Sequence, residues 1–147
     1  MIIQLKEHAA GTAGKVIYTA RVHTVGEREN GEARGSDGRL DVKLSPPGSP
    51  RDGTNPEQLF AAGWSACFES AIGIAARKRE VTVPALTIDA EVDRHFADAE
   101  YSLGARFDIS LRGLDSGVAQ SLVERAEWLC PYSKATQGNV DVLFNLI

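Results

Sequence analysis

The chain has 147 residues, 43% of them hydrophobic and 24% charged, which is the composition of one soluble globular domain over residues 1–147. Its 16 basic and 20 acidic side chains give a net charge of −4, and this acidic balance argues against a nucleic-acid-binding surface. Two cysteines are too few for a disulfide scaffold, and three scattered histidines predict no metal site.

We expect a cytoplasmic protein with no membrane partner. Met1–Lys6 lacks the long apolar core of a signal peptide. The longest apolar stretch, Leu59–Phe68, is interrupted by Gly63 and Ser65 and is too short to span a bilayer. In the cytoplasm thiols are normally kept reduced, so any disulfide there would be transient.

The first third of the chain predicts two strands. Residues 15–24 alternate between two faces and predict a half-buried strand, which the polar, glycine-bounded turn Gly26–Gly31 follows. Arg39–Ser45 alternates again, with its leucines and valine inward. Residues 45–53 contain three prolines and therefore predict an irregular loop.

A long helix is predicted next. Thr54 and Glu57 have the spacing of a capping box, and Pro56 suits the first helical turn. The segment from there to about Arg79 is almost uncharged until Arg77 and is apolar on all sides. That pattern indicates a helix that is buried on most of its surface.

The remainder of the chain predicts strand, strand, helix and strand. Residues 86–94 and 105–112 alternate, and a polar loop over 97–104 separates them. Asp115 and Ser116 start a helix that ends before Pro131, which pushes Cys130 out of the helical region. Residues 140–147 form a last strand. This order predicts an α+β fold with mainly antiparallel sheets.

The two cysteines have a structural and a chemical interpretation. Cys67 lies inside the long apolar helix, where free cysteines commonly serve as small hydrophobic residues. Cys130 lies at a helix end beside proline and polar residues, which core packing does not require. Peroxide chemistry would need a Cys67 thiolate, a cation to stabilise it and a second thiol to resolve the sulfenic acid. The residues alone leave both interpretations open.

Familiar cofactor motifs are absent from the sequence. It contains no GxGxxG, P-loop, CxxC or HExxH motif, so we expect neither a cofactor nor a metal. Gly63-Trp-Ser-Ala-Cys67 is similar to a nucleophile elbow, but it has cysteine in place of the closing glycine and lies inside a helix. Serine hydrolysis is therefore disfavoured.

Two segments resemble a known family. Thr54-Asn-Pro-Glu-Gln-Leu-Phe-Ala-Ala-Gly-Trp-Ser-Ala-Cys-Phe68 resembles the first cysteine motif of the organic hydroperoxide resistance (Ohr) proteins in the OsmC/Ohr family. Cys130-Pro-Tyr-Ser-Lys-Ala-Thr-Gln-Gly-Asn-Val-Asp-Val142 resembles their second motif. Residues 16–20 and 36–45 also look like the family. The order of these segments matches, so the resemblance covers nearly the whole chain.

The resemblance implies a thiol-dependent peroxidase that reduces organic hydroperoxides, alkyl or fatty-acid, to alcohols as an antioxidant stress response. Cys67 matches the peroxidatic cysteine and Cys130 the resolving cysteine of the family. Glu57 matches a glutamate that orients the catalytic arginine, which we assign to Arg28 in the glycine-bounded turn. Arg21 is the competing residue, but it lies within an alternating strand and is interpreted as a surface residue.

The resemblance also implies the partners of the protein. The family forms an interlocked homodimer with active sites at the subunit interface, and its reductants are dithiols, notably protein-bound lipoyl groups. Phe60, Trp64 and Phe68 suggest an apolar substrate pocket, although ordinary core packing explains them equally well.

The sequence departs from the family pattern at several positions. Glu27 replaces a glycine and adds, with Glu29, a carboxylate beside the arginine; Trp64 replaces a tyrosine, and Gln137 replaces an arginine. Two alternative functions remain. One is an OsmC-branch peroxidase with broader peroxide use, and the other is a non-enzymatic, redox-sensing module that binds an apolar ligand.

Overall fold

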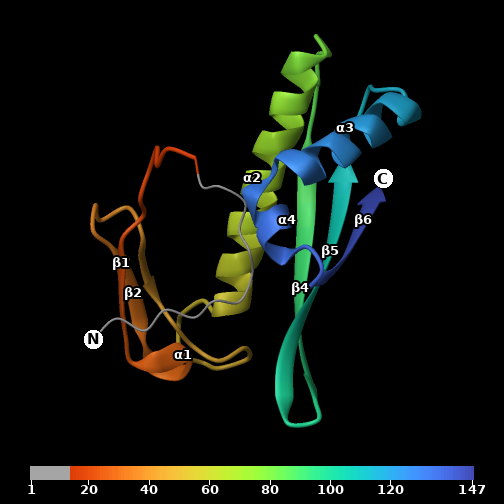
Figure 1. Ribbon diagram of the computed structural model, residues 1–147. Coiled ribbons are helices and arrows are strands. Elements are labelled where there is room, and N and C mark those ends of the chain that lie inside the picture. The colour runs from red at the N-terminus through yellow and green to blue at the C-terminus, as the bar shows by residue number, and fades with distance from the viewer. Residues whose placement is uncertain (1–13) are drawn as a thin grey trace.

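The computed structural model describes residues 14–147, which form two three-stranded sheets and four helices (Figure 1). The expectation drawn from Met1–Lys6 lies outside these residues. In chain order the elements are β1 (Val22–Val25), α1 (Glu27–Asn30), β2 (Glu32–Gly35), β3 (Asp41–Lys43), α2 (Pro56–Lys78), β4 (Thr87–Ala97), β5 (Glu100–Ser110), α3 (Ser116–Leu129), α4 (Pro131–Thr136) and β6 (Asp141–Leu146). The predicted α+β fold class is confirmed.

The smaller sheet has the order β1-β2-β3 and is antiparallel throughout. The prediction of a half-buried strand over residues 15–24 is wrong before Val22, where β1 starts, and its half-burial is wrong as well, because all four residues of β1 are exposed. Val16, Ile17 and Tyr18 are 75%, 94% and 76% exposed, so the described chain gives this alternating segment no surface to pack on. Strand β2 was not predicted, since only four residues separate the α1 turn from the next loop.

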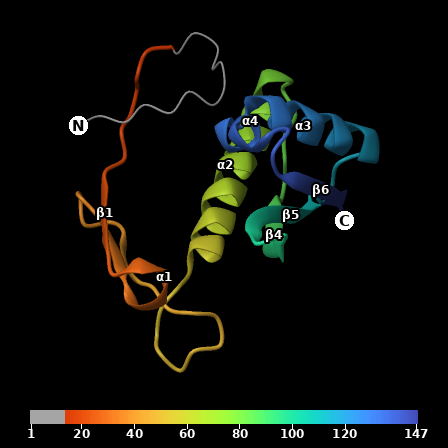
Figure 2. The same cartoon turned by 60° about the horizontal axis from the view of Figure 1, so that its bottom comes forward.

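The larger sheet carries the core. Its order is β4-β5-β6, with β4 and β5 antiparallel and β5 and β6 parallel. Helix α2 packs on β4, α3 packs on α2, and α2 lies between the two sheets (Figure 2). The largest fully buried side chains come from α2, β5, α3 and the end of α3: Trp64, Phe68, Ile72, Phe107, Ile109, Leu122 and Cys130.

The predicted polar loop over residues 97–104 is wrong. Strands β4 and β5 continue through most of it and form a long hairpin that extends beyond the body of the molecule (Figure 1). The chain reverses at Asp98 and Ala99, whose φ angles are 51° and 64°. Two consecutive positive φ angles are typical of the tight hairpin turn that matches strand twist. Neither residue is a glycine, so the usual sequence signal for this turn is missing.

Helix α2 is confirmed, but its predicted cap is wrong. Asn55 is the N-cap residue, and its Oδ1 accepts a hydrogen bond from the backbone N–H of Gln58 at 2.9 Å. Thr54 instead donates its hydroxyl to the side chain of Gln58. The Glu57 carboxylate is therefore not used in a capping box and is available for another partner.

Helix α2 is longer than its most apolar stretch. Over Pro56–Lys78 it is long and apolar enough, with a mean hydropathy of 1.4, to meet the length and composition criteria for a membrane span. The argument that the longest apolar stretch, Leu59–Phe68, is too short to span a bilayer therefore considered only part of the helix. Core helices of globular domains meet the same criteria, and α2 packs against α3, α4 and β4.

The predicted end of α3 is confirmed. Asp115 caps its N-terminus by accepting from the N–H groups of Gly117 and Val118, and Cys130 leaves the helical region with ψ at 119°. The sequence interpretation missed α4, which starts at Pro131 directly after this break. Proline suits the first position of a helix because its missing N–H has no partner there. Cys130 thus sits in the corner between two helices.

The cap assignment predicts which substitution destabilises α2. Replacing Asn55 with alanine leaves the Gln58 N–H without its partner and lowers the free energy of unfolding by about 1 kcal/mol. The matched substitution Thr54→Ala, one residue earlier, costs less. Urea denaturation of both variants measures the difference, and a larger loss for Thr54→Ala contradicts the assignment.

Candidate active site

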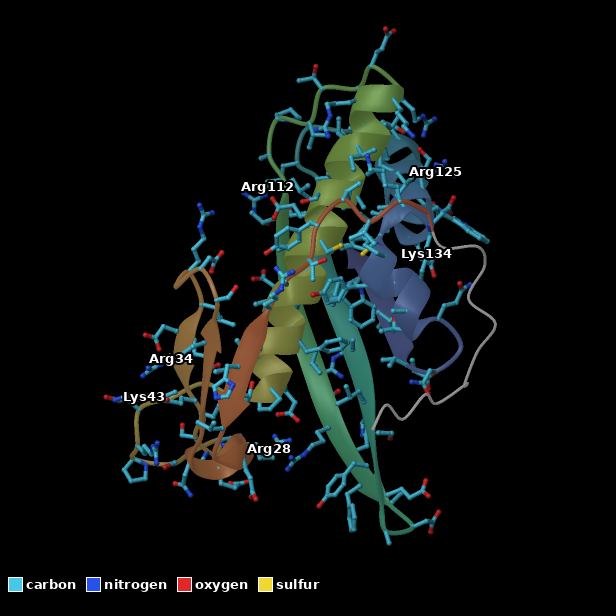
Figure 3. All side chains as sticks on the ribbon, turned by 60° about the vertical axis from the view of Figure 1, so that its left-hand side comes forward. Arg28, Arg34, Lys43, Arg112, Arg125 and Lys134 are labelled. Atoms are coloured by element: carbon cyan, nitrogen blue, oxygen red, sulfur yellow. The ribbon has the colours of Figure 1, made fainter. Side chains whose placement is uncertain are left out.

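An arginine–glutamate pair joins the small sheet to the start of α2. The Arg28 Nη2 donates to Glu57 Oε2 at 2.6 Å. Arg28 comes from α1, on the side that faces α2 (Figure 3). The two side chains are 33% and 16% exposed, so the contact is only partly screened by water. Arg28 and Glu57 are thus the first two of the predicted site residues that the structure brings together.

The backbone around α1 explains how Arg28 is presented. Gly26 and Glu27 both have positive φ, at 76° and 61°. A Cβ at Gly31 would lie 2.2 Å from the carbonyl oxygen of Glu27, so only glycine allows the turn to close this tightly. The carbonyl of Gly31 then accepts from the N–H of Leu44, which anchors the turn on the chain leading to α2.

The connection to α2 is also fixed by backbone pairing. Leu44 and Thr54 form a parallel bridge: the Thr54 N–H donates to Lys43 and the Ser45 N–H to Thr54, each at 2.9 Å. The proline-rich loop between them therefore begins and ends at the same place. This closure holds the first turn of α2 beside the small sheet, where Glu57 meets Arg28.

The pair perturbs both ionisation equilibria. Burial opposes the charge on Glu57, but the hydrogen bond from Arg28 and the attraction of the nearby guanidinium groups outweigh it, so the pKa of Glu57 lies below its usual value. The hydrogen bond to Glu57 raises the pKa of Arg28. Both groups are therefore held in their charged forms at neutral pH.

A second arginine at this place was missed by the sequence interpretation. Arg94 Nη1 lies 3.9 Å from Glu57 Oε1, and its guanidinium stacks 5.2 Å above the ring of Tyr101. A cavity of about 340 Å³ lies between Arg28, Glu57 and Arg94. The signal was present, because Arg94 continues the inward-facing register of residues 86, 88, 90 and 92 along β4.

The two thiols form a second pair. Cys130 Sγ lies 3.4 Å from Cys67 Sγ, although the residues are 63 positions apart. Cys130 is fully buried and Cys67 is half-buried, and both are free thiols. Burial raises the pKa of the Cys67 thiol, and its interaction with the neighbouring Cys130 thiol raises it further; a backbone hydrogen bond from Tyr132 only partly opposes them.

The charged pair and the thiol pair lie apart within one chain. Glu57 and Cys67 are ten residues apart on the same straight helix, which corresponds to a rise of about 15 Å. Accordingly, no arginine is among the groups that perturb the pKa of Cys67. The described chain thus contains two half-sites at different heights on α2.

The aromatic residues proposed for a substrate pocket have core positions. Trp64 and Phe68 are fully buried, and their rings pack edge-on against Phe107. Phe60 is half-buried and packs against Trp64, with ring centroids 5.4 Å apart. The lining of the cavity beside Arg28 includes none of the three residues Phe60, Trp64 and Phe68.

The remaining candidate positions lie on the surface. Arg21 is exposed and precedes β1, where its backbone carbonyl accepts from Ser36. Glu27 and Gln137 are also exposed, and Glu29 Oε1 is 3.8 Å from Arg28 Nε. Among residues 14–147, no group of three or more histidine, cysteine, aspartate or glutamate side chains is arranged to hold a metal ion.

Comparisons with known proteins agree on one family. The OsmC family, described as OsmC-like protein, matches residues 46–144. An organic hydroperoxide resistance protein from Xanthomonas axonopodis pv. citri is 42% identical over 137 residues, which are 90% of this chain and 96% of that protein. The organic hydroperoxide resistance protein OhrA of Bacillus subtilis is 42% identical over 132 residues, 86% of this chain and 93% of that protein.

Solved structures agree with these relatives. The crystal structure of the organic hydroperoxide resistance protein OhrB of Bacillus subtilis has a TM-score of 0.85 and 37% identity, over 90% of this chain and 100% of that chain. A Vibrio cholerae structure, described as a putative organic hydroperoxide resistance protein with captopril bound in one of its active sites, has a TM-score of 0.83 and 32% identity, over 90% and 93% of the two chains. The family resemblance of the two cysteine motifs is confirmed.

The Arg28–Glu57 contact predicts a pH-dependent contribution to stability. Because the folded-state pKa of Glu57 lies below its unfolded value of about 4.3, the ionised pair stabilises the fold above that pH and loses its effect as pH falls through the folded-state pKa. We expect Glu57→Gln to be less stable than the natural protein at pH 7, with the difference shrinking below about pH 4.

Chemical denaturation at pH 7, 5 and 3 measures this difference. The control is Glu69→Gln, an exposed glutamate on the same helix. If the difference in unfolding free energy between Glu57→Gln and the natural protein is the same at all three pH values, the contribution of Glu57 to stability does not come from its charge.

Proposed function

The chain belongs to the OsmC/Ohr family, and we propose that it is a thiol-dependent peroxidase that reduces organic hydroperoxides to alcohols. The family is one of organic hydroperoxide resistance, an antioxidant and stress-response function. The observation that carries the proposal is the thiol pair. In a chain of this family, Cys67 on α2 and Cys130 in the corner between α3 and α4 approach to 3.4 Å, at the positions of the two cysteine motifs.

The chemistry needs one oxidisable thiolate and one resolving thiol. The Cys67 thiolate attacks the terminal oxygen of the hydroperoxide; an S–O bond forms, the O–O bond breaks, and the departing alkoxide takes a proton to become the alcohol. Cys67 is then a sulfenic acid. The Cys130 thiol condenses with it, and the products are a Cys67–Cys130 disulfide and water.

The return to the dithiol state requires two electrons from an external dithiol. We assign this role to a dithiol such as a protein-bound lipoyl group, by resemblance to the family. Its first thiolate attacks one sulfur of the disulfide and its second thiol releases the mixed disulfide, so the reductant leaves as a cyclic disulfide. The protein itself needs no further cofactor for this cycle.

The thiolate of Cys67 needs a cation, and residues 14–147 of its own chain place none among the groups that shift its pKa. Burial alone disfavours the thiolate, and a positive charge is the physical means of restoring it. Arg28, oriented by Glu57, is the natural source, but Glu57 lies about 15 Å from Cys67 along α2, and Arg28 is not among the groups that shift the pKa of Cys67. We therefore assign the active site to a homodimer in which the Arg28–Glu57 pair of one copy serves Cys67 of the other.

Exposed apolar surface supports such a dimer. Val16, Ile17 and Tyr18 have no partner surface in the described chain, and Ala66 and Ile74 of α2 are exposed as well. A segment that alternates like a strand in sequence yet lacks a neighbour is suited to pairing with another chain. A second copy that covers these residues would bury the surface and complete the site.

The roles of the two cysteines predict two different failures. Replacing Cys67 with serine abolishes consumption of cumene hydroperoxide in the presence of dihydrolipoamide, because no thiolate remains to attack the peroxide. Replacing Cys130 with serine allows about one turnover and then leaves Cys67 as a sulfenic acid. Peroxide consumption and intact-protein mass spectrometry measure both outcomes.

Comparison with hydrogen peroxide provides the control. An Ohr-type enzyme consumes the organic hydroperoxide faster, whereas similar rates indicate an OsmC-type peroxidase. Failure of the natural protein to consume either peroxide would reject the enzyme and leave the redox-sensing binding module.

The shared active site predicts complementation between two inactive variants. Cys67→Ser and Arg28→Ala are each expected to be inactive or very slow as homodimers. A heterodimer of the two contains one site with both an intact Cys67 and an intact Arg28, and therefore recovers about half of the natural rate per dimer. Co-expression with two different affinity tags isolates this species.

The opposite assignment makes the opposite prediction. When both residues of each site belong to the same chain, every site of the heterodimer lacks one of them, and activity stays at the level of the single variants. That result would contradict the shared site without affecting the assignment of the thiols.

A further inference from the structure

A buried hydrogen bond joins the helix of Cys67 to the helix that follows Cys130. Trp64 Nε1 donates to Ser133 Oγ at 3.1 Å. Trp64 is fully buried, and Ser133 is buried on α4. An indole N–H has no second way to be satisfied in the core, so this contact fixes where the first turn of α4 lies.

Two further contacts bring α4 close to α2 at the same height. A Cβ on Gly63 would lie 3.2 Å from the Tyr132 hydroxyl, so α4 approaches α2 at a position without a side chain. The rings of Phe60 and Tyr132 pack with centroids 6.4 Å apart. The hydrogen bond from Trp64 is the directional side-chain contact of this group, and the backbone hydrogen bond from Tyr132 to Cys67 is a second directional link between α4 and α2.

These contacts determine the position of Cys130. It is the N-cap residue of α4 and lies three residues before Ser133, so a shift of α4 moves its sulfur. The sulfurs are 3.4 Å apart, and a disulfide bond is about 2.05 Å long. Only about 1.4 Å of closure separates the two states.

We propose that the Trp64–Ser133 hydrogen bond is a positioning device for the resolving step, and that it protects Cys67 from over-oxidation. The inference rests on the proposed peroxidase function. Once Cys67 is a sulfenic acid, two reactions compete for it. The Cys130 thiol condenses with it to give the disulfide and water, or a second hydroperoxide oxidises it to sulfinic acid and leaves as an alcohol.

The hydrogen bond decides this competition through geometry. With α4 held on α2, the Cys130 thiol is already beside Cys67 when the sulfenic acid forms, and the intramolecular reaction is favoured by proximity. Without it, α4 samples positions in which Cys130 is further away. Trp64 and Ser133 are positioning residues here, since both are buried and neither supplies a reacting atom.

Single-turnover kinetics separate the two steps. One equivalent of cumene hydroperoxide is added to the reduced natural protein and to Ser133→Ala, and samples are quenched into dimedone, which traps the sulfenic acid. Mass spectrometry then follows loss of the thiol and formation of the disulfide. We expect Ser133→Ala to leave the first rate constant within about twofold and to slow disulfide formation about three- to tenfold, the loss that one hydrogen bond accounts for.

The partition between products is the second measurement. At high hydroperoxide concentration, the concentration that converts half of Cys67 to sulfinic acid falls in Ser133→Ala by the same factor as the resolving rate. A role in overall stability alone would not move this ratio. We expect Trp64→Phe, which keeps an aromatic ring but removes the donor, to show the same change in the ratio of the two rate constants. The double variant with Trp64→Phe and Ser133→Ala should change this ratio no further than either single variant.

Trp128 provides the matched control. It is the only other tryptophan of the chain and lies two residues before Cys130, but it is 64% exposed. Trp128→Phe is expected to retain both rate constants. An unchanged ratio in Ser133→Ala and Trp64→Phe, or an equal fall of both rate constants, overturns the inference while the peroxidase function stands. Absence of any Cys67 oxidation in the natural protein overturns both.

Discussion

The pKa of a buried thiol is the constraint on which the structure depends. Cys67 is placed among apolar residues and beside a second thiol, and both influences work against the thiolate that peroxide chemistry requires. Arg28 would favour a thiolate, but it pairs with Glu57, which lies about 15 Å from Cys67 along α2. Under the proposed function, assembly of two chains brings the missing charge to the thiol. The exposed apolar segment of residues 16–18 and the exposed apolar positions of α2 would then serve the reaction, because they would hold the two chains together.

Helix α2 is the common frame of both half-sites. Its first turn presents Glu57, its middle presents Trp64, and Cys67 follows three residues later. A continuous helix fixes the spacing of these groups more rigidly than loops do, since each residue advances the chain by the same rise and rotation. The partners that meet α2 come from shorter elements, α1 and α4, which are held by glycine-dependent close approaches and by a few hydrogen bonds. Helix α2 therefore fixes the spacing of the site residues, and the shorter elements α1 and α4 bring their partners to it.

The sequence predicted elements whose signals are local. The bounds of α2 and α3, and the break at Cys130, follow from capping residues and prolines within a few positions of each boundary. Predictions failed where the structure of a segment depends on partners that are distant in the sequence. The hairpin turn at Asp98 and Ala99 uses positive φ angles without glycine, and residues 15–21 alternate without a surface to cover them in one chain. The pairing of Arg28 with Glu57 was inferred from the family motif, whereas Arg94 was overlooked although its strand register points to the same cavity.

The acidic departures around Arg28 illustrate how burial decides between competing partners. Glu29 is the nearer of the two in sequence, but its carboxylate lies 3.8 Å from Arg28 Nε and is 53% exposed. Glu57 lies at 2.6 Å and is only 16% exposed. Attraction between charges weakens with distance and with the dielectric constant of the surroundings, so the closer and less hydrated carboxylate dominates. Arg28 lies within 4 Å of both carboxylates at once, through Nε to Glu29 and through Nη2 to Glu57. The acidic departures on the turn therefore add negative charge beside the arginine without displacing Glu57 as its dominant partner.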